Sequence, residues 1–186
     1  MEPNSQIKII EAQVRECFGR VVWSNKTHEK CADILIKRNN FIKISQIVLS
    51  ALTSTGVLVA VFGENKTVGI ITAVISAVMF GLNAFVKGHD FGELAQKHSD
   101  AAADLWDIRE TYLSLITDIN AKSLSIAEIT ERRDVIQVKL SSIYKGSPRT
   151  ISKAYKAATK ALKLNEELTF SVSEIDMLLP LELRKS

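Results

Sequence analysis

The chain contains few side chains that could bind a metal ion or attack a substrate. Its histidines are His28, His89 and His98, and its cysteines are Cys17 and Cys31. His89 lies one helical turn before Glu93, so these two could meet, but no HExxH motif or comparable ligand set accompanies them. The sequence also lacks a nucleophile elbow, paired catalytic carboxylates and a cysteine–histidine signature. We therefore predict no metal site, no cofactor and no catalytic residues, and a protein that is not an enzyme.

Polar side chains recur inside an otherwise apolar stretch. Thr72, Ser76 and Asn83 follow one another at steps of four and seven, which places them along one line of a helix, and Ser50 and Ser54 lie in the preceding apolar stretch. Hydroxyl groups in such a setting either bond to their own helix and tighten packing, or face water. An asparagine brings two donors and an acceptor, so Asn83 needs a partner or water. These five residues are candidate pore-lining residues, with helix packing as the alternative.

Small residues form a second row in the same stretch. The row is Gly69, Ala73, Ala77 and Gly81, each four residues apart. Rows of this kind let helix backbones approach closely in lipid, where no hydrophobic drive exists between helices. We expect this row to be a helix-packing face.

Five cations form a stripe in the second half of the chain: Arg149, Lys153, Lys156, Lys160 and Lys163. Their spacing of four, three, four and three places them on one helix face. The stripe is either a solvated face, or a surface for anionic lipid headgroups, an acidic partner or a nucleotide. No glycine-rich phosphate loop accompanies it. The net charge of +3 is too small to indicate nucleic-acid binding.

The polar and small rows are positioned by two apolar runs, residues 41–62 and 68–86, separated by Gly63–Thr67. Each run is close to the roughly 20 residues that a helix needs to cross a bilayer. The short connector predicts one membrane hairpin over residues 41–86.

The basic residues that flank the hairpin predict its orientation. Lys26, Lys30, Lys37 and Arg38 precede it and Lys87 and Lys97 follow it, whereas the connector holds only Lys66. The positive-inside rule then places both termini in the cytoplasm. In that reducing compartment we expect Cys17 and Cys31 to be buried free thiols rather than a disulfide.

The rest of the chain carries helical signals and no strand pattern, which predicts an all-α protein. We expect residues 1–40 to form an amphipathic helix over 6–22, a break at Trp23–Asn25 and the start of the first long helix, which Ser24 or Asn25 can cap. Residues 87–186 form a cytosolic helical region. After a neck at Gly88 and Gly92, a coiled-coil-like seam, with His98 as a core histidine, runs along residues 91–119.

Two capping boxes and one clear stop divide the remainder of this region. Ser125 and Glu128 open a helix that reaches about Tyr144 and ends at Gly146–Pro148, where glycine favours a left-handed exit. A further helix covers residues 150–168. Ser171 and Glu174 form the second box, before the short apolar segment 175–179.

Several short motifs occur in a fixed order around the hairpin. They are Gly19–Lys30 before it, His98 and Leu105 after it, Ser125 with Glu131–Arg133, Tyr144 with Pro148, and Glu174–Pro180. In this order they resemble the SLATT domain, a bacterial two-transmembrane effector domain, over essentially the whole chain.

The resemblance implies an effector of nucleotide-signalled antiviral systems that forms a pore in the inner membrane. A pore requires an oligomer of four or more chains, because two helices cannot enclose water. The partner that makes or senses the nucleotide would be encoded separately. Two alternatives remain: a membrane-anchored scaffold that recruits a cytosolic partner without conducting ions, and a soluble bundle that buries the hairpin.

Overall fold

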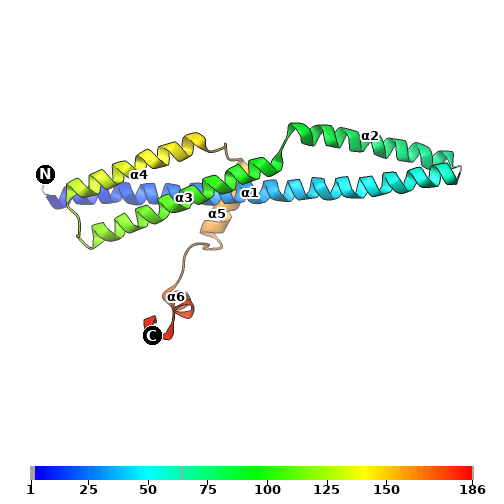
Figure 1. The fold of residues 1–186 in the computed structure, drawn as a ribbon. Helices are drawn as coiled ribbons and strands as arrows, with labels where there is room; N and C mark the ends of the chain where they lie inside the picture. Colours follow the sequence, from blue (N-terminus) through cyan, green and yellow to red (C-terminus); the bar gives the residue numbers. More distant parts are fainter. Residues whose placement is uncertain (1–2, 64, 186) are drawn as a thin grey trace.

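The computed structural model describes residues 3–63 and 65–185, and every element in these ranges is helical (Figure 1). The elements are α1 (Pro3–Phe62), α2 (Lys66–Gly88), α3 (Phe91–Asn120), α4 (Ile126–Gly146), α5 (Ser152–Lys163), α6 (Val172–Leu178) and a 3-10 turn (Leu181–Leu183). The all-α prediction is confirmed. Helix α1 runs the length of the molecule, with α2 beside one half of it and α3, α4 and α5 against the other half (Figure 1).

Helix α1 is continuous, so the predicted break at Trp23–Asn25 is wrong. The two side chains that were expected to cap a new helix make contacts between helices instead. Asn25 donates from Nδ2 to the Ala102 carbonyl of α3 at 2.7 Å, and the hydroxyls of Ser24 and Tyr144 lie 3.1 Å apart. Because these polar side chains contact other helices, neither caps a new helix, and α1 continues through this segment.

The hairpin consists of the second half of α1 and the whole of α2, which pack antiparallel. Its helices coincide closely with the predicted runs at 41–62 and 68–86. The connector is shorter than predicted because Lys66 and Thr67 belong to α2, whose N-cap is Asn65 with its side chain accepting from the Val68 N–H. Glu64 lies outside the described residues.

The predicted neck coincides with a helix boundary. Helix α2 ends at Gly88, and α3 starts at Phe91 with Asp90 as its N-cap, whose carboxylate accepts from the Glu93 N–H at 2.8 Å. The two residues between these helices, His89 and Asp90, connect the hairpin to the helical bundle (Figure 1).

The core of the bundle lies between the first half of α1 and helices α3 and α4. The predicted seam of α3 is the face that is buried: Phe91, Ala95, His98, Ala101, Ala102, Leu105, Ile108, Tyr112, Leu115 and Ile119. Val14, Cys17 and Val21 of α1 and Ile129 and Ile136 of α4 pack against its distal half. The free thiols of Cys17 and Cys31 are both buried, as expected.

The bounds of the later helices differ in part from prediction. Both capping boxes form as predicted, at Ser125 and Ser171. Helix α4 ends at Gly146 without a positive φ, so the left-handed exit is wrong. Helix α5 ends at Lys163 rather than at residue 168, because Glu166 and Leu168 adopt positive φ and turn the backbone.

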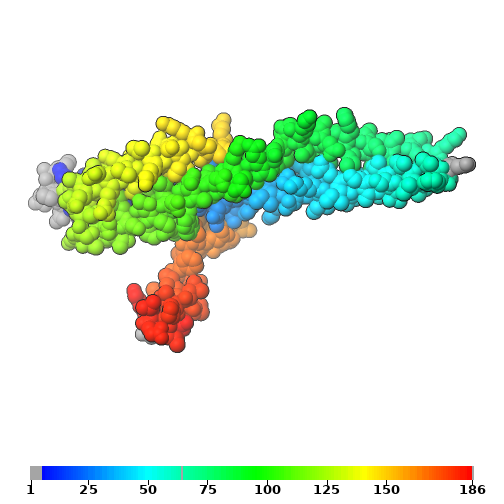
Figure 2. Space-filling model, viewed as in Figure 1, coloured from blue at the N-terminus to red at the C-terminus, as the bar shows by residue number. Residues whose placement is uncertain are grey.

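The C-terminal segment leaves the bundle. Helix α6 and the 3-10 turn project from it on a thin connection (Figures 1 and 2). Seven apolar side chains in the segment from Phe170 to Leu183 are exposed. Both ends of the described chain lie on the same side of the hairpin (Figure 1).

Candidate functional site

The outer surface of the hairpin is apolar and is not covered by the rest of the chain. Both helices are long and apolar enough to cross a membrane, and only 0% and 6% of their apolar windows are buried. The exposed side chains include Ile44, Ile47, Val48, Leu52 and Leu58 of α1 and Ile70, Val74, Val78 and Phe80 of α2. The core helix of a soluble bundle would bury such side chains. The bundle of this chain therefore does not bury the hairpin.

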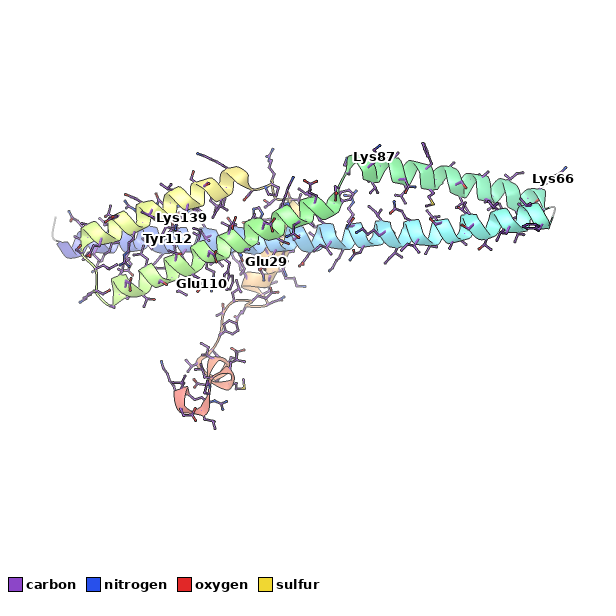
Figure 3. The ribbon with its side chains drawn as sticks, in the orientation of Figure 1. Glu29, Lys66, Lys87, Glu110, Tyr112 and Lys139 are labelled. Atoms are coloured by element: carbon purple, nitrogen blue, oxygen red, sulfur yellow. The ribbon has the colours of Figure 1, made fainter. Side chains whose placement is uncertain are left out.

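Lysines mark the two ends of α2. Figure 3 shows Lys66 at the tip of the hairpin and Lys87 at the opposite end of the helix. The helix has 23 residues, or about 35 Å at 1.5 Å per residue, against a hydrocarbon core of about 30 Å. The two amines can therefore reach opposite headgroup layers.

The polar side chains of the hairpin gather along the seam where α1 and α2 meet. Thr72 is buried, and its Oγ1 donates to the Val68 carbonyl at 2.8 Å. Its side chain fills the space above Gly56, where an added Cβ would lie 2.2 Å from Oγ1. Ser76 is half-buried and donates to the Thr72 carbonyl at 2.9 Å.

One of the two candidates on α1 lies on the same seam. Ser50 is half-buried and its Oγ lies 3.4 Å from the sulfur of Met79. Ser54 is exposed and donates to the Ser50 carbonyl of its own helix at 3.0 Å. The structure therefore brings Thr72, Ser76 and Ser50 to one antiparallel seam and leaves Ser54 outside it.

Asn83 has a partner that sequence reasoning missed. Its Oδ1 accepts from Nε2 of Gln46 at 2.7 Å, across the seam. Gln46 lies one helical turn before Ser50 and two turns before Ser54, so extending that row backward by one step would have found it. Because Asn83 remains exposed, its amide is free to bond with water or another chain as well.

The row of small residues mostly lies outside the seam. Gly69 faces α1, where an added Cβ would lie 3.6 Å from the Cβ of Ala60. Ala73, Ala77 and Gly81 are exposed, and nothing lies within 4 Å of a Cβ built on Gly81. Three of the four predicted packing residues therefore face outward, away from the partner helix in the same chain.

A second polar cluster lies buried in the bundle, between α1 and α3. His28 and His98 are 4% and 2% exposed, and their Nδ1 atoms lie 3.0 Å apart. Burial lowers the pKa of His28 to about 4, aided by the nearby His98, and burial also lowers the pKa of His98. Both rings are therefore neutral at pH 7, with one Nδ1–H donating to the other ring. His98 is a core histidine, as predicted.

Lys26 ties the segment after α5 to α1. Its amine lies 2.8 Å from carboxylate oxygens of both Glu29 and Glu167. Burial disfavours the charged amine, but the two carboxylates outweigh burial and raise the pKa of Lys26. Lys30 contacts Glu167 at 3.6 Å as well.

The possible pair of His89 and Glu93 does not form. His89 Nδ1 contacts the Phe85 carbonyl at 3.1 Å and its ring stacks on Phe85, while Glu93 pairs with Lys97 at 2.7 Å. Within residues 3–63 and 65–185, no three histidine, cysteine, aspartate or glutamate side chains come together as a metal site.

The cationic stripe is exposed, and four of its five members lie on α5: Lys153, Lys156, Lys160 and Lys163. Arg149 precedes the helix. Ala154, Ala158 and Ala161 form the opposite, buried face. The amine of Lys163 lies 5.4 Å above the ring of Trp23.

One comparison with known proteins identifies a family. A model described as the SMODS and SLOG-associating 2TM effector domain family 4 matches residues 10–174, which include the hairpin and the bundle. No curated protein and no solved structure matches the chain.

Proposed function

The chain belongs to the SMODS and SLOG-associating 2TM effector domain family 4, and we propose that it is an oligomeric, pore-forming effector of the bacterial inner membrane. Membership makes it a membrane effector of SMODS- and SLOG-associated systems. Beyond membership, we propose that the protein forms an oligomer, that this oligomer is a pore, and that it lies in the inner membrane. The pore depolarises the cell during a nucleotide-signalled antiviral response.

The observation that carries the proposal is the distribution of polarity around the hairpin. Apolar side chains cover its outer surface, whereas Thr72, Ser50 and the Gln46–Asn83 pair lie where the two helices meet. Burying amides in lipid costs free energy unless they are paired, and Gln46 and Asn83 pair with each other across the seam. A polar seam supplies the wet wall that an ion pathway requires.

In the proposed pore, four or more hairpins surround a central axis. The exposed face of Ala73, Ala77 and Gly81 lets neighbouring hairpins approach closely. The candidate pore-lining residues then line the axis once the seam opens: Thr72, Ser76, Asn83, Ser50 and Ser54. Gln46 extends this lining by one helical turn. The seam carries no ring of charges, so we expect weak ion selectivity.

We propose that both termini lie in the cytoplasm. The bundle and α6 then face the compartment in which a nucleotide-generating or nucleotide-sensing partner, encoded separately, would act. The lysines and arginine before the hairpin, and the lysines after it, support this orientation.

Induced expression together with the neighbouring genes tests the proposal. The membrane potential, read with a voltage-sensitive dye, should collapse, and Asn83→Leu should slow the collapse. Ala84→Leu is the matched control, because Ala84 is the exposed neighbour of Asn83. An intact potential, together with ion-tight proteoliposomes under the same activating conditions, would contradict pore formation.

A second candidate function is a membrane-anchored scaffold, and the C-terminal segment favours it. Seven apolar side chains between Phe170 and Leu183 are exposed there, at a distance from the bundle. Such a segment can dock on a cytosolic partner. If the protein is a scaffold, replacing residues 41–86 by an unrelated two-span anchor preserves activity, whereas a pore loses it.

A further inference from the structure

A cleft of about 320 Å³ opens on the cytosolic bundle where α1, α4 and α5 meet. Its walls include the aromatic side chains Trp23, Tyr144 and Tyr155 and the cation Arg149. Small-molecule sites range from about 300 to 1,000 Å³, so the cleft is large enough for one compact ligand. It is separate from the hairpin seam.

The aromatic walls suit a planar group. The rings of Trp23 and Tyr155 lie 5.9 Å apart with their planes at 38°, and more than half of Tyr155 is exposed. Tyr144 is exposed too, and its hydroxyl lies 3.1 Å from that of Ser24. Open aromatic faces of this kind stack with nucleobases, and neighbouring hydroxyls can bond to a base edge or a sugar.

The charges around the cleft suit an anion. Arg149 lines it, and Lys163 places its amine 5.4 Å from the Trp23 ring. Helix α5 begins beside Arg149 and Thr150, and no side chain caps it at Ile151. Ile151, Ser152 and Lys153 at the start of α5 do not line the cleft, so the guanidinium of Arg149 is the group placed to hold an anion. A cleft that binds a cation between aromatic rings would be lined by acidic residues, whereas the charged residue that lines this cleft is Arg149.

The position of the cleft favours a soluble ligand over a lipid headgroup. Trp23 lies eighteen residues before Phe41, where the apolar run begins, and α1 is continuous between them. At 1.5 Å per residue this is about 27 Å along the helix. A headgroup at the membrane surface does not reach that far.

We propose that this cleft binds a nucleoside phosphate, with the base against Tyr155 and Trp23 and the phosphate at Arg149. The site lies on the effector chain itself, so the soluble signal can act on it directly. Binding can be measured whether or not the hairpin conducts ions, so this proposal and the pore proposal can fail independently.

Tryptophan fluorescence provides the assay, because the chain has two tryptophans and Trp106 can be removed. Full-length protein carrying Trp106→Phe, in detergent, is titrated with the four ribonucleoside 5′-monophosphates and their 3′,5′-cyclic forms. The matching nucleosides and inorganic phosphate are titrated as fragments. At least one nucleotide should quench Trp23 with higher affinity than either of its fragments.

Substitutions then separate the two halves of the site. Arg149→Ala should weaken nucleotide binding about tenfold or more and leave nucleoside binding unchanged, because only the phosphate contact is lost. Tyr155→Ala should weaken both about tenfold, and Tyr155→Phe should restore both. Lys145→Ala, which removes an exposed cation outside the cleft, is the matched control.

Three results would overturn the proposal. One is the absence of quenching by every nucleotide at millimolar concentration. Another is an equal loss of affinity in Lys145→Ala and Arg149→Ala, which would mean that only the general positive charge attracts the ligand. The third is quenching by phosphatidylglycerol vesicles that nucleotides do not compete away, which would assign the cleft to a lipid headgroup.

Discussion

Replacing Gly56 by alanine should loosen the hairpin, because the new methyl group has no room. A Cβ at this position would lie 2.2 Å from Oγ1 and 3.2 Å from Cβ of Thr72. Overpacking of this kind costs about 1–3 kcal/mol, and the better helix propensity of alanine returns about 0.5–1 kcal/mol. We therefore expect a net destabilisation of up to about 2.5 kcal/mol, with a central value of about 1 kcal/mol, from these two effects.

Gly81→Ala is the matched control. Nothing lies within 4 Å of a Cβ at Gly81, so this substitution keeps the propensity gain without the clash. It should be neutral, or stabilising by up to about 1 kcal/mol. The two variants change the same residue type in the same hairpin, so their difference isolates packing against Thr72.

Unfolding of the purified protein in mixed micelles by SDS, followed by circular dichroism, measures both effects. Adding Thr72→Ala to Gly56→Ala should recover part of the loss, because it removes the contact to Oγ1 but leaves a Cβ at 3.2 Å. If Gly56→Ala and Gly81→Ala shift the unfolding midpoint equally, α1 and α2 do not pack in this register.

Three further predictions test other parts of the structure. Burial lowers the pKa of His28 from 6.5 to about 4, so between these pH values the unfolded chain binds a proton at this ring and the folded chain does not. The contribution of this ring to bundle stability should therefore be fully present above about pH 6.5 and fall by up to about 3 kcal/mol as the pH drops toward 4, as thermal unfolding would show; a flat profile would refute the buried neutral ring. Ser125→Ala should cost about 1 kcal/mol by removing the N-cap of α4, while Ser142→Ala on the exposed face of the same helix should cost almost nothing; equal midpoints in thermal unfolding would show that the capping box does not stabilise α4. Ala60→Cys combined with Gly69→Cys should form an intramolecular disulfide, seen by mass spectrometry, because an added Cβ at Gly69 lies 3.6 Å from that of Ala60; Ala60→Cys with Gly81→Cys should not, and cross-linking in both pairs would indicate a hairpin without fixed register.

Periodicity was sufficient to predict α3 and its buried face. The α3 seam from Phe91 to Ile119 follows directly from apolar residues at steps of three and four, and it is the buried face. The capping boxes at Ser125 and Ser171 were predictable for a similar reason, since the spacing of serine and glutamate matches a local geometry.

Contacts between distant segments were not predictable from local patterns. Asn25 looks like a helix cap, but it bonds to Ala102, which lies 77 residues away. The partnership of Gln46 with Asn83 depends on the antiparallel register of the hairpin, and that of His28 with His98 depends on how α3 crosses α1. The end of α5 was missed because positive φ at Glu166 and Leu168 is unusual for these residue types.

The candidate hairpin residues were predictable as two rows, but the way each row faces within the chain was not. Thr72 and Ser76 pack between α1 and α2, whereas Ala73 and Ala77 face outward. Helical spacing separates the rows and leaves open which one faces the partner helix, because both small and hydroxyl residues suit close packing.

Cysteine accessibility in a planar bilayer tests the pore most directly. Single cysteines are introduced by Ser76→Cys and Asn83→Cys, and by Ala73→Cys and Ala77→Cys as outward-facing controls, in protein reconstituted with its activating partner. A membrane-impermeant cationic thiol reagent should reduce the current at the first two positions and leave the current unchanged at the other two. Absence of any current, or block only at Ala73→Cys and Ala77→Cys, would contradict a pore lined by the hairpin seam.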